Sequence, residues 1–148
     1  MVYWSLVRRL SGTAQPLYTH AENNMTVTTK SLYERLGGYD AIAAVVGKLL
    51  PRLENDPQLG RFRANRGDDR LAREKQLLVD YLCASAGGPM LYTGRDMPTA
   101  HKGMGISETD WDMFTGHLKA TLADFQVPQQ EQDDVPGFID STREGIVE

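Results

Sequence analysis

The sequence predicts an all-α fold, and three observations support this prediction. Apolar residues recur every three or four positions in several long stretches, the spacing that places them on one face of a helix. No stretch alternates apolar and polar residues convincingly over the length of a strand. Ser31 and Ser107 are each followed three residues later by an acidic residue, which is typical of helix starts.

Two helices are predicted close together at the start of the folded part. The first begins at Ser31 and ends at Gly37-Gly38, where two glycines release the backbone. Pro51 lies inside the second and is expected to kink or loosen its last turn, because proline removes a backbone donor. The core-facing stripe of this second helix consists of Ile42, Val45, Val46, Leu49 and Leu53.

The middle of the chain alternates between short and long segments. After a turn at Asp56-Pro57, a short segment carries Leu59 and Phe62. The next helix ends before Gly87-Gly88-Pro89 and has an apolar face of Leu71, Leu78 and Leu82. Residues 89–104 are expected to be irregular, with one short helical turn at most.

Two amphipathic helices are predicted in the last third of the chain. The first starts at Ser107 and has a stripe of Trp111, Phe114, Leu118, Leu122 and Phe125. The second is expected to be capped by Asp133 or Asp134, because Pro136 then falls in the first turn, where proline is tolerated. Its stripe consists of Val135, Phe138, Ile139, Thr142 and Ile146.

Length and composition indicate one globular domain in the cytoplasm. The 148 residues carry a net charge of −4 with no dense basic stripe, which argues against nucleic acid as a partner. A lone cysteine, Cys83, excludes an internal disulfide, and no apolar run is long enough to span a bilayer. Residues 1–30 are predicted to be a poorly ordered extension, with a short amphipathic arm as the alternative, and residues 31–148 to be the folded domain.

Among the three histidines, His101 has the setting expected of a ligand. His20 lies in the extension and has no assigned role, and His117 flanks an apolar helix stripe, where a structural hydrogen bond is expected. His101 stands in a glycine-rich stretch near Met97, Met104 and Ile106, side chains able to surround a haem-ligating imidazole. This setting alone leaves a structural role for His101 open.

Several motifs, in this order and spacing, resemble those of group I truncated haemoglobins. They are Leu32-Tyr33-Glu34-Arg35-Leu36-Gly37-Gly38, Gly87-Gly88-Pro89, Tyr92-Thr93-Gly94 and Met97-x-x-x-His101-x-Gly103-x-Gly105-Ile106. The resemblance covers residues from Ser31 to the end of the sequence. It implies a truncated globin, with two helix pairs in a two-over-two sandwich around haem b (iron protoporphyrin IX) and His101 as the proximal iron ligand.

The same resemblance implies which side chains surround the haem. Its contacts are expected to be Phe62, Leu78, Leu82, Tyr92, Met97 and Ile106. Lys102, Arg95 or Arg73 are candidates to bind its propionates.

On the distal side the sequence departs from the family pattern. Leu50 stands where many members have a tyrosine that donates a hydrogen bond to bound O₂. The family's distal glutamine corresponds to Gln76 by motif and to Leu78 by counting back from Gly87-Gly88, and Tyr81 is the other candidate donor. Weaker O₂ retention than in tyrosine-bearing relatives is therefore expected.

The implied function is reversible binding of O₂, CO or NO at the haem iron, with NO detoxification or redox or gas sensing as candidate uses. Enzymatic activity is left open: NO dioxygenation would require a separate reductase, and no acid–base pair is evident for peroxidase turnover. A cofactor-free helical interaction module is the alternative, followed by a haem-free enzyme using His101 and Asp96. The chain is expected to be a monomer or weak dimer.

Overall fold

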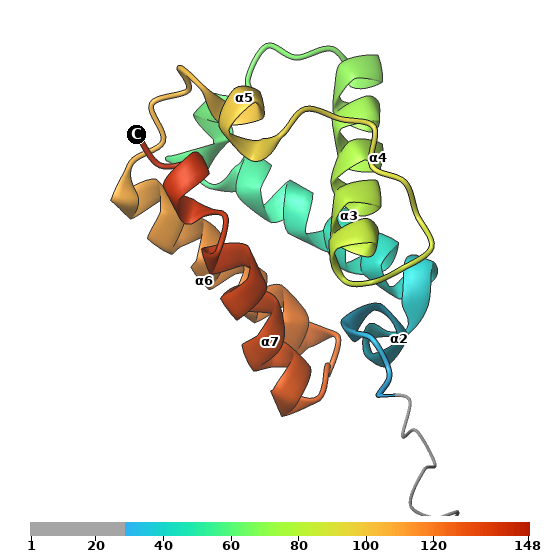
Figure 1. Cartoon of the computed structure of the whole chain (residues 1–148). Coiled ribbons are helices and arrows are strands. Elements are labelled where there is room, and N and C mark those ends of the chain that lie inside the picture. Colours follow the sequence, from blue (N-terminus) through green and yellow to red (C-terminus); the bar gives the residue numbers. More distant parts are fainter. Residues whose placement is uncertain (1–28) are drawn as a thin grey trace, which may run out of the picture.

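The computed structural model describes residues 29–148, and every regular element in this range is a helix (Figure 1). The predicted extension therefore lies outside the described residues, except for its last two. The elements are α2 (Leu32–Leu36), α3 (Gly38–Asn55), the 3-10 turn η1 (Leu59–Phe62), α4 (Asp68–Ser85), α5 (Met97–His101), α6 (Glu108–Asp124), α7 (Gln129–Asp140) and the 3-10 turn η2 (Arg143–Gly145). The all-α prediction is confirmed.

Both predicted serine caps are present. Ser31 Oγ accepts a hydrogen bond from the Glu34 amide at 3.2 Å, and Glu34 Oε2 accepts one from the Ser31 amide at 2.8 Å. Ser107 and Asp110 form the same reciprocal box at the start of α6. The two starts are thus set by local hydrogen bonds that the spacing of serine and acidic residues predicts.

The limits of the last helix differ from the prediction. Helix α7 begins at Gln129, earlier than the expected caps Asp133 and Asp134, so Pro136 lies in its interior. A tertiary contact stabilises the additional turn, because Arg35 of α2 binds Glu131 at 2.6 Å and Asp134 at 2.8 Å. The helix ends at Asp140, and the predicted stripe residues Thr142 and Ile146 flank η2 instead.

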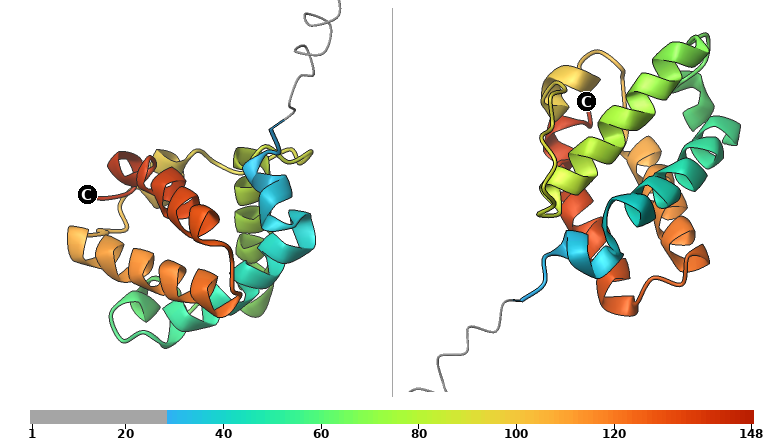
Figure 2. Two further views of the ribbon diagram at one scale, coloured as in Figure 1. Left: turned by 90° about the horizontal axis from the view of Figure 1, so that it is seen from below. Right: turned by 90° about the vertical axis from the view of Figure 1, so that its right-hand side faces the viewer.

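Helix α3 shares one layer of the sandwich with α4 and also packs against α6 of the other layer. One of its faces packs against α4, and α6 and α7 run antiparallel in the other layer (Figures 1 and 2). The cluster between α3 and α4 consists of Ile42, Val46, Leu50, Val79 and Cys83. The cluster that joins α3 to α6 and α7 consists of Leu49, Trp111, Leu118, Leu122, Val135 and Ile139. The two-over-two arrangement is confirmed, and α3 continues through Pro51 to Asn55.

Candidate haem-binding site

His101 is the last residue of α5, a helix of five residues between two irregular segments. Asp96 caps this helix, since its Oδ1 accepts a hydrogen bond from the Thr99 amide at 2.7 Å. Pro98 occupies the first turn, where its lack of an amide hydrogen has no cost. These local signals hold a single helical turn in a stretch that lacks any apolar stripe, and they place the imidazole at its end.

The imidazole of His101 has a defined tautomer. Its Nδ1 lies 2.9 Å from the carbonyl oxygen of Met97, one turn earlier in α5. A carbonyl oxygen only accepts hydrogen bonds, so in the neutral imidazole Nδ1 carries the proton and Nε2 carries the lone pair. The side chain is half-buried, and a backbone carbonyl that accepts a hydrogen bond from one ring nitrogen prepares a histidine for metal binding through the other.

Tyr92 fixes the loop that leads to α5. Its hydroxyl donates a hydrogen bond to the Arg95 carbonyl at 2.6 Å. Its ring meets that of Tyr81 on α4 edge to face, with centroids 5.2 Å apart. The ring lies so close to Gly94 that a Cβ atom there would be 2.2 Å from the hydroxyl oxygen. The structure thus brings the predicted site residues Tyr81 and Tyr92 together and uses them to brace the loop.

The other predicted haem contacts come from several elements. Met97 starts α5, and Ile106 ends the loop after His101, where it is buried. Phe62 lies on η1, half-buried, with the Arg61 guanidinium 4.2 Å from its ring centroid. Leu78 and Leu82 lie on the inner side of α4.

An ion pair between exposed Arg61 and buried Asp110 fixes η1, and with it Phe62, against α6. Both guanidinium nitrogens of Arg61 bind Asp110, at 2.7 and 3.0 Å, and Gln58 Nε2 adds a third hydrogen bond at 2.7 Å. The Arg61 guanidinium holds the pKa of Asp110 well below its usual range, against the burial that would raise it. Asp110 therefore both caps the start of α6 and holds η1 in position.

The expected distal residues separate into an inner and an outer group. Leu50 is buried at 7% exposure between α3 and α4, and Leu78 packs against the same cluster. The Gln76 side chain is exposed on the outside of α4, where its Nε2 donates to the Tyr39 hydroxyl and to Asp80, both at 2.9 Å. Of the two alternatives for the distal glutamine position, Gln76 thus lies on the outside of α4 and Leu78 on its inner side, because residues two apart on a helix point to nearly opposite faces.

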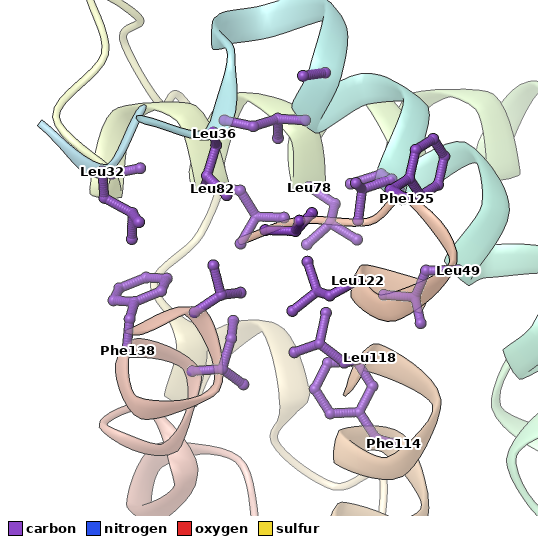
Figure 3. A pocket seen from close by; sticks show the side chains of 18 residues that line it. Leu32, Leu36, Leu49, Leu78, Leu82, Phe114, Leu118, Leu122, Phe125 and Phe138 are labelled. Carbon is purple, nitrogen blue, oxygen red and sulfur yellow. The ribbon is translucent and has the colours of Figure 1, made fainter. Parts of the chain in front are cut away.

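An apolar cavity of about 170 Å³ lies between the two layers (Figure 3). Leu78 and Leu82 line it from α4, opposite Phe114 and Leu118 of α6. The lining also includes Leu36 of α2, and all eighteen of its residues are apolar. Sequence patterns identified several of these positions as helix stripes but gave no sign of a cavity, because its presence depends on how closely the layers pack.

The donor groups around His101 fit a haem. Among residues 29–148, no three His, Cys, Asp or Glu side chains lie together in a way that would hold a metal ion. Haem iron takes four of its ligands from the porphyrin, so a single protein imidazole such as that of His101 is enough to anchor it. Arg73, Arg95 and Lys102 are exposed, and within the described range none of them makes an ion pair, so they are available to the propionates.

Comparison with known families agrees with this site. Residues 31–147 match the family of bacterial-like globins, a stretch that runs from the cap of α2 through η2. The chain belongs to this globin family. The family implies a haem cofactor, which the residues around His101 fit.

Relatives of this globin place it among the group 1 truncated haemoglobins. It is 35% identical over 109 residues to the group 1 truncated haemoglobin GlbN of Mycolicibacterium paratuberculosis, covering 74% of this chain and 78% of that protein. It superimposes on the truncated haemoglobin of Tetrahymena pyriformis in the Fe(III) form with a TM-score of 0.73 and 29% identity, over 80% of this chain and 98% of the other. The 2/2 haemoglobin of a Synechococcus species, in the cyanomet state with covalently attached haem, gives 0.69 and 30%, over 77% and 94%.

Proposed function

We propose that this truncated haemoglobin binds the diatomic gases O₂, CO and NO reversibly at the iron of haem b, with His101 as the protein's ligand to the iron. The observation that supports this most directly is the hydrogen bond from His101 Nδ1 to Met97, which leaves Nε2 with its lone pair. When bound, the haem supplies an iron centre with a coordination position for the gas. His101 anchors that centre, and the Met97 carbonyl keeps the ring from rotating.

The remaining side chains have complementary roles in this proposal. Phe62, Leu82, Tyr92, Met97 and Ile106 cover the porphyrin with apolar surface and exclude water from it. Arg73, Arg95 and Lys102 bind the propionates at the exposed edge. The apolar side chains thus match the porphyrin ring, and the cations match its propionates.

Leu50 and Leu78 make the distal side apolar, since neither carries a hydrogen-bond donor. The cavity that Leu78 also lines is apolar on all sides, and such a cavity holds small apolar molecules more readily than water. O₂, CO and NO have this character. The distal side is thus suited to admit these gases and to release them readily.

Titration of the purified protein with hemin tests the proposal. We expect a Soret band on binding, a five-coordinate ferrous spectrum, and a shift of that spectrum on exposure to CO. His101→Gly should lose the five-coordinate spectrum, and free imidazole should restore it. A colourless protein that ignores hemin would exclude this function and favour a cofactor-free helical interaction module.

His117→Gln is the matched control for the histidine. His117 Nε2 lies 2.8 Å from Asp56 and joins α6 to the turn after α3, so its nitrogen is already in use. The control should bind hemin with the unmodified spectrum. Loss of the five-coordinate spectrum in His117→Gln, with retention in His101→Gly, would show that His117 is the iron ligand and would overturn the proposal.

We propose that the protein acts in the cytoplasm, either in NO detoxification or as a sensor of redox state or of gases. Turnover of NO to nitrate needs electrons, and we propose that a separate reductase supplies them. None of the helices in residues 29–148 is long and apolar enough to cross a bilayer. Consumption of NO by the ferrous, O₂-equilibrated protein, sustained only when a reductase is added, would support this use.

A further inference from the structure

The loop between His101 and α6 is held by one side chain from the far end of the sequence. The carboxylate of Glu148 accepts a hydrogen bond from the Gly103 amide at 2.7 Å and one from the Gly105 amide at 2.6 Å. The Glu148 amide donates to the Ile106 carbonyl at 2.9 Å. One residue thus binds three main-chain groups within five residues of His101.

The amide positions depend on backbone conformations that glycine adopts readily. Gly103 and Gly105 have φ angles of +77° and +64°, and with them both N–H groups reach the same carboxylate. Glycine loses more conformational entropy on ordering than other residues, so this loop would be mobile without external hydrogen bonds. A carboxylate is a strong acceptor for such amides, because charge-assisted hydrogen bonds exceed neutral ones in strength.

The same terminal segment also contacts the residues before His101. Turn η2 packs against α5, and a Cβ atom on Gly145 would lie 2.9 Å from Cγ of Pro98. Arg143 of η2 pairs with Glu108 at the start of α6. Figure 1 shows this segment beside α5 and the loop that follows it. The segment therefore contacts the chain on both sides of the histidine.

A five-residue helix requires such support. Helix α5 is too short to be stable by itself, since an isolated helix of one turn does not repay its nucleation cost. Its last residue carries the imidazole, and the Met104 amide, which lies in the loop, donates to the His101 carbonyl at 3.1 Å. Movement of residues 103–105 would be transmitted directly to His101.

We propose that Glu148 is a positioning residue for the haem iron: by fixing the loop from Gly103 to Ile106, it sets the orientation of the His101 imidazole. The inference rests on the proposed function, in which His101 is the iron ligand. Glu148 lies one residue beyond the stretch that matches the globin family. The low pKa of Glu148, caused by the Gly103 and Gly105 amides, agrees with a carboxylate held in its charged form.

Two variants and a control test the proposal. Glu148→Ala removes both acceptors, and Glu148→Gln retains one oxygen, which keeps the test valid if the alanine variant folds poorly. Glu144→Ala is the control, because Glu144 is an exposed carboxylate on η2 in the same segment. In the protein as purified, amide hydrogen exchange at Gly103 and Gly105 should accelerate about tenfold in Glu148→Ala, the change expected for loss of a single net hydrogen bond. It should accelerate less in Glu148→Gln and remain unchanged in Glu144→Ala.

The second readout is the iron–histidine stretching band of the ferrous, haem-loaded protein, measured by resonance Raman. We expect it to shift or broaden in Glu148→Ala, with partial recovery in Glu148→Gln, and hemin release to accelerate severalfold. Unchanged amide exchange would overturn the proposal. Faster exchange with a band and a hemin-release rate equal to those of Glu144→Ala would also overturn it, since Glu148 would then order the loop without positioning His101.

Failure of the proposed function has a different signature. If His101→Gly keeps the unmodified spectrum with hemin, His101 is not the ligand, and both proposals fall regardless of the Glu148 variants. Because amide exchange is measured without added hemin, it separates loss of the loop contact from loss of haem binding.

Discussion

Gln76 donates a hydrogen bond to the hydroxyl of Tyr39, 2.9 Å away, on the outer side of the α3–α4 layer. Gln76 is exposed, whereas Tyr39 is half-buried against the α3–α4 cluster, which contains Leu50 and against which Leu78 also packs. In the proposed site, Leu50 and Leu78 provide no hydrogen-bond donor on the distal side. We therefore expect the protein to retain O₂ weakly.

Replacing Leu50 with tyrosine should slow O₂ dissociation. The new hydroxyl would donate a hydrogen bond to the bound gas, and a hydrogen bond worth about 1.4 kcal/mol corresponds to roughly a tenfold lower dissociation rate. Since Leu50 is buried, the larger ring should also cost about 1–3 kcal/mol of stability through overpacking. Leu50→Phe supplies the ring without the hydroxyl. Equal dissociation rates for the two variants, in stopped-flow measurements, would show that position 50 does not face the gas.

Substitutions at Gln76 and Leu78 of α4 test which of these two positions faces the bound gas. Gln76→Leu should leave the O₂ dissociation rate unchanged, because its amide is engaged with Tyr39 and Asp80 at the surface. Leu78→Gln places the same amide on the inner face and should slow dissociation. Faster dissociation in Gln76→Leu would show that Gln76 turns inward when the haem is bound.

The fold was predictable from local signals, whereas the site was predictable only in part. Helix starts at Ser31 and Ser107 follow from hydrogen bonds between residues three apart, so the spacing of serine and acidic residues is sufficient to find them. The start of α7 at Gln129 depends on Arg35, almost a hundred residues away, and no local pattern reports such a contact. Motif and residue count leave Gln76 and Leu78 as alternatives, and only the structure shows that Leu78 is the one on the inner face of α4.

Asp110→Asn should destabilise the protein and make its free energy of unfolding depend less on pH. The variant loses the charge-assisted hydrogen bonds to Arg61, and we expect a loss of about 1–3 kcal/mol in the free energy of unfolding at neutral pH. The pKa of Asp110 is lower in the folded than in the unfolded state, so its stabilising contribution is present above the unfolded pKa and is lost as the pH falls toward the folded one.

Urea unfolding between pH 7 and pH 3 measures this effect. The unmodified protein should lose more stability over this range than Asp110→Asn does. Asp112→Asn, an exposed carboxylate on the same helix, should retain the steeper pH dependence. Parallel curves for the unmodified protein and Asp110→Asn would mean that the Arg61 pair contributes no net stability.

Gly94→Ala should weaken the loop that leads to His101. The new methyl group would meet the Tyr92 hydroxyl, and although a side chain can move, Tyr92 would then lose its hydrogen bond to Arg95 and its contact with the Tyr81 ring. We expect a loss of about 1–2 kcal/mol in the free energy of unfolding, the sum of one net hydrogen bond and one aromatic contact. Hemin release should accelerate as well, because the same loop holds α5.

A double-mutant cycle separates the steric effect from other consequences of the substitution. In a Tyr92→Leu background the phenol is absent, so Gly94→Ala should cost less than it does alone. Gly116→Ala is the control: no heavy atom lies within 4 Å of the added Cβ on α6, and a gain of up to about 1 kcal/mol is expected from helix propensity. Additive costs in the cycle would show that Gly94 is required for its own backbone conformation rather than for the close approach of Tyr92.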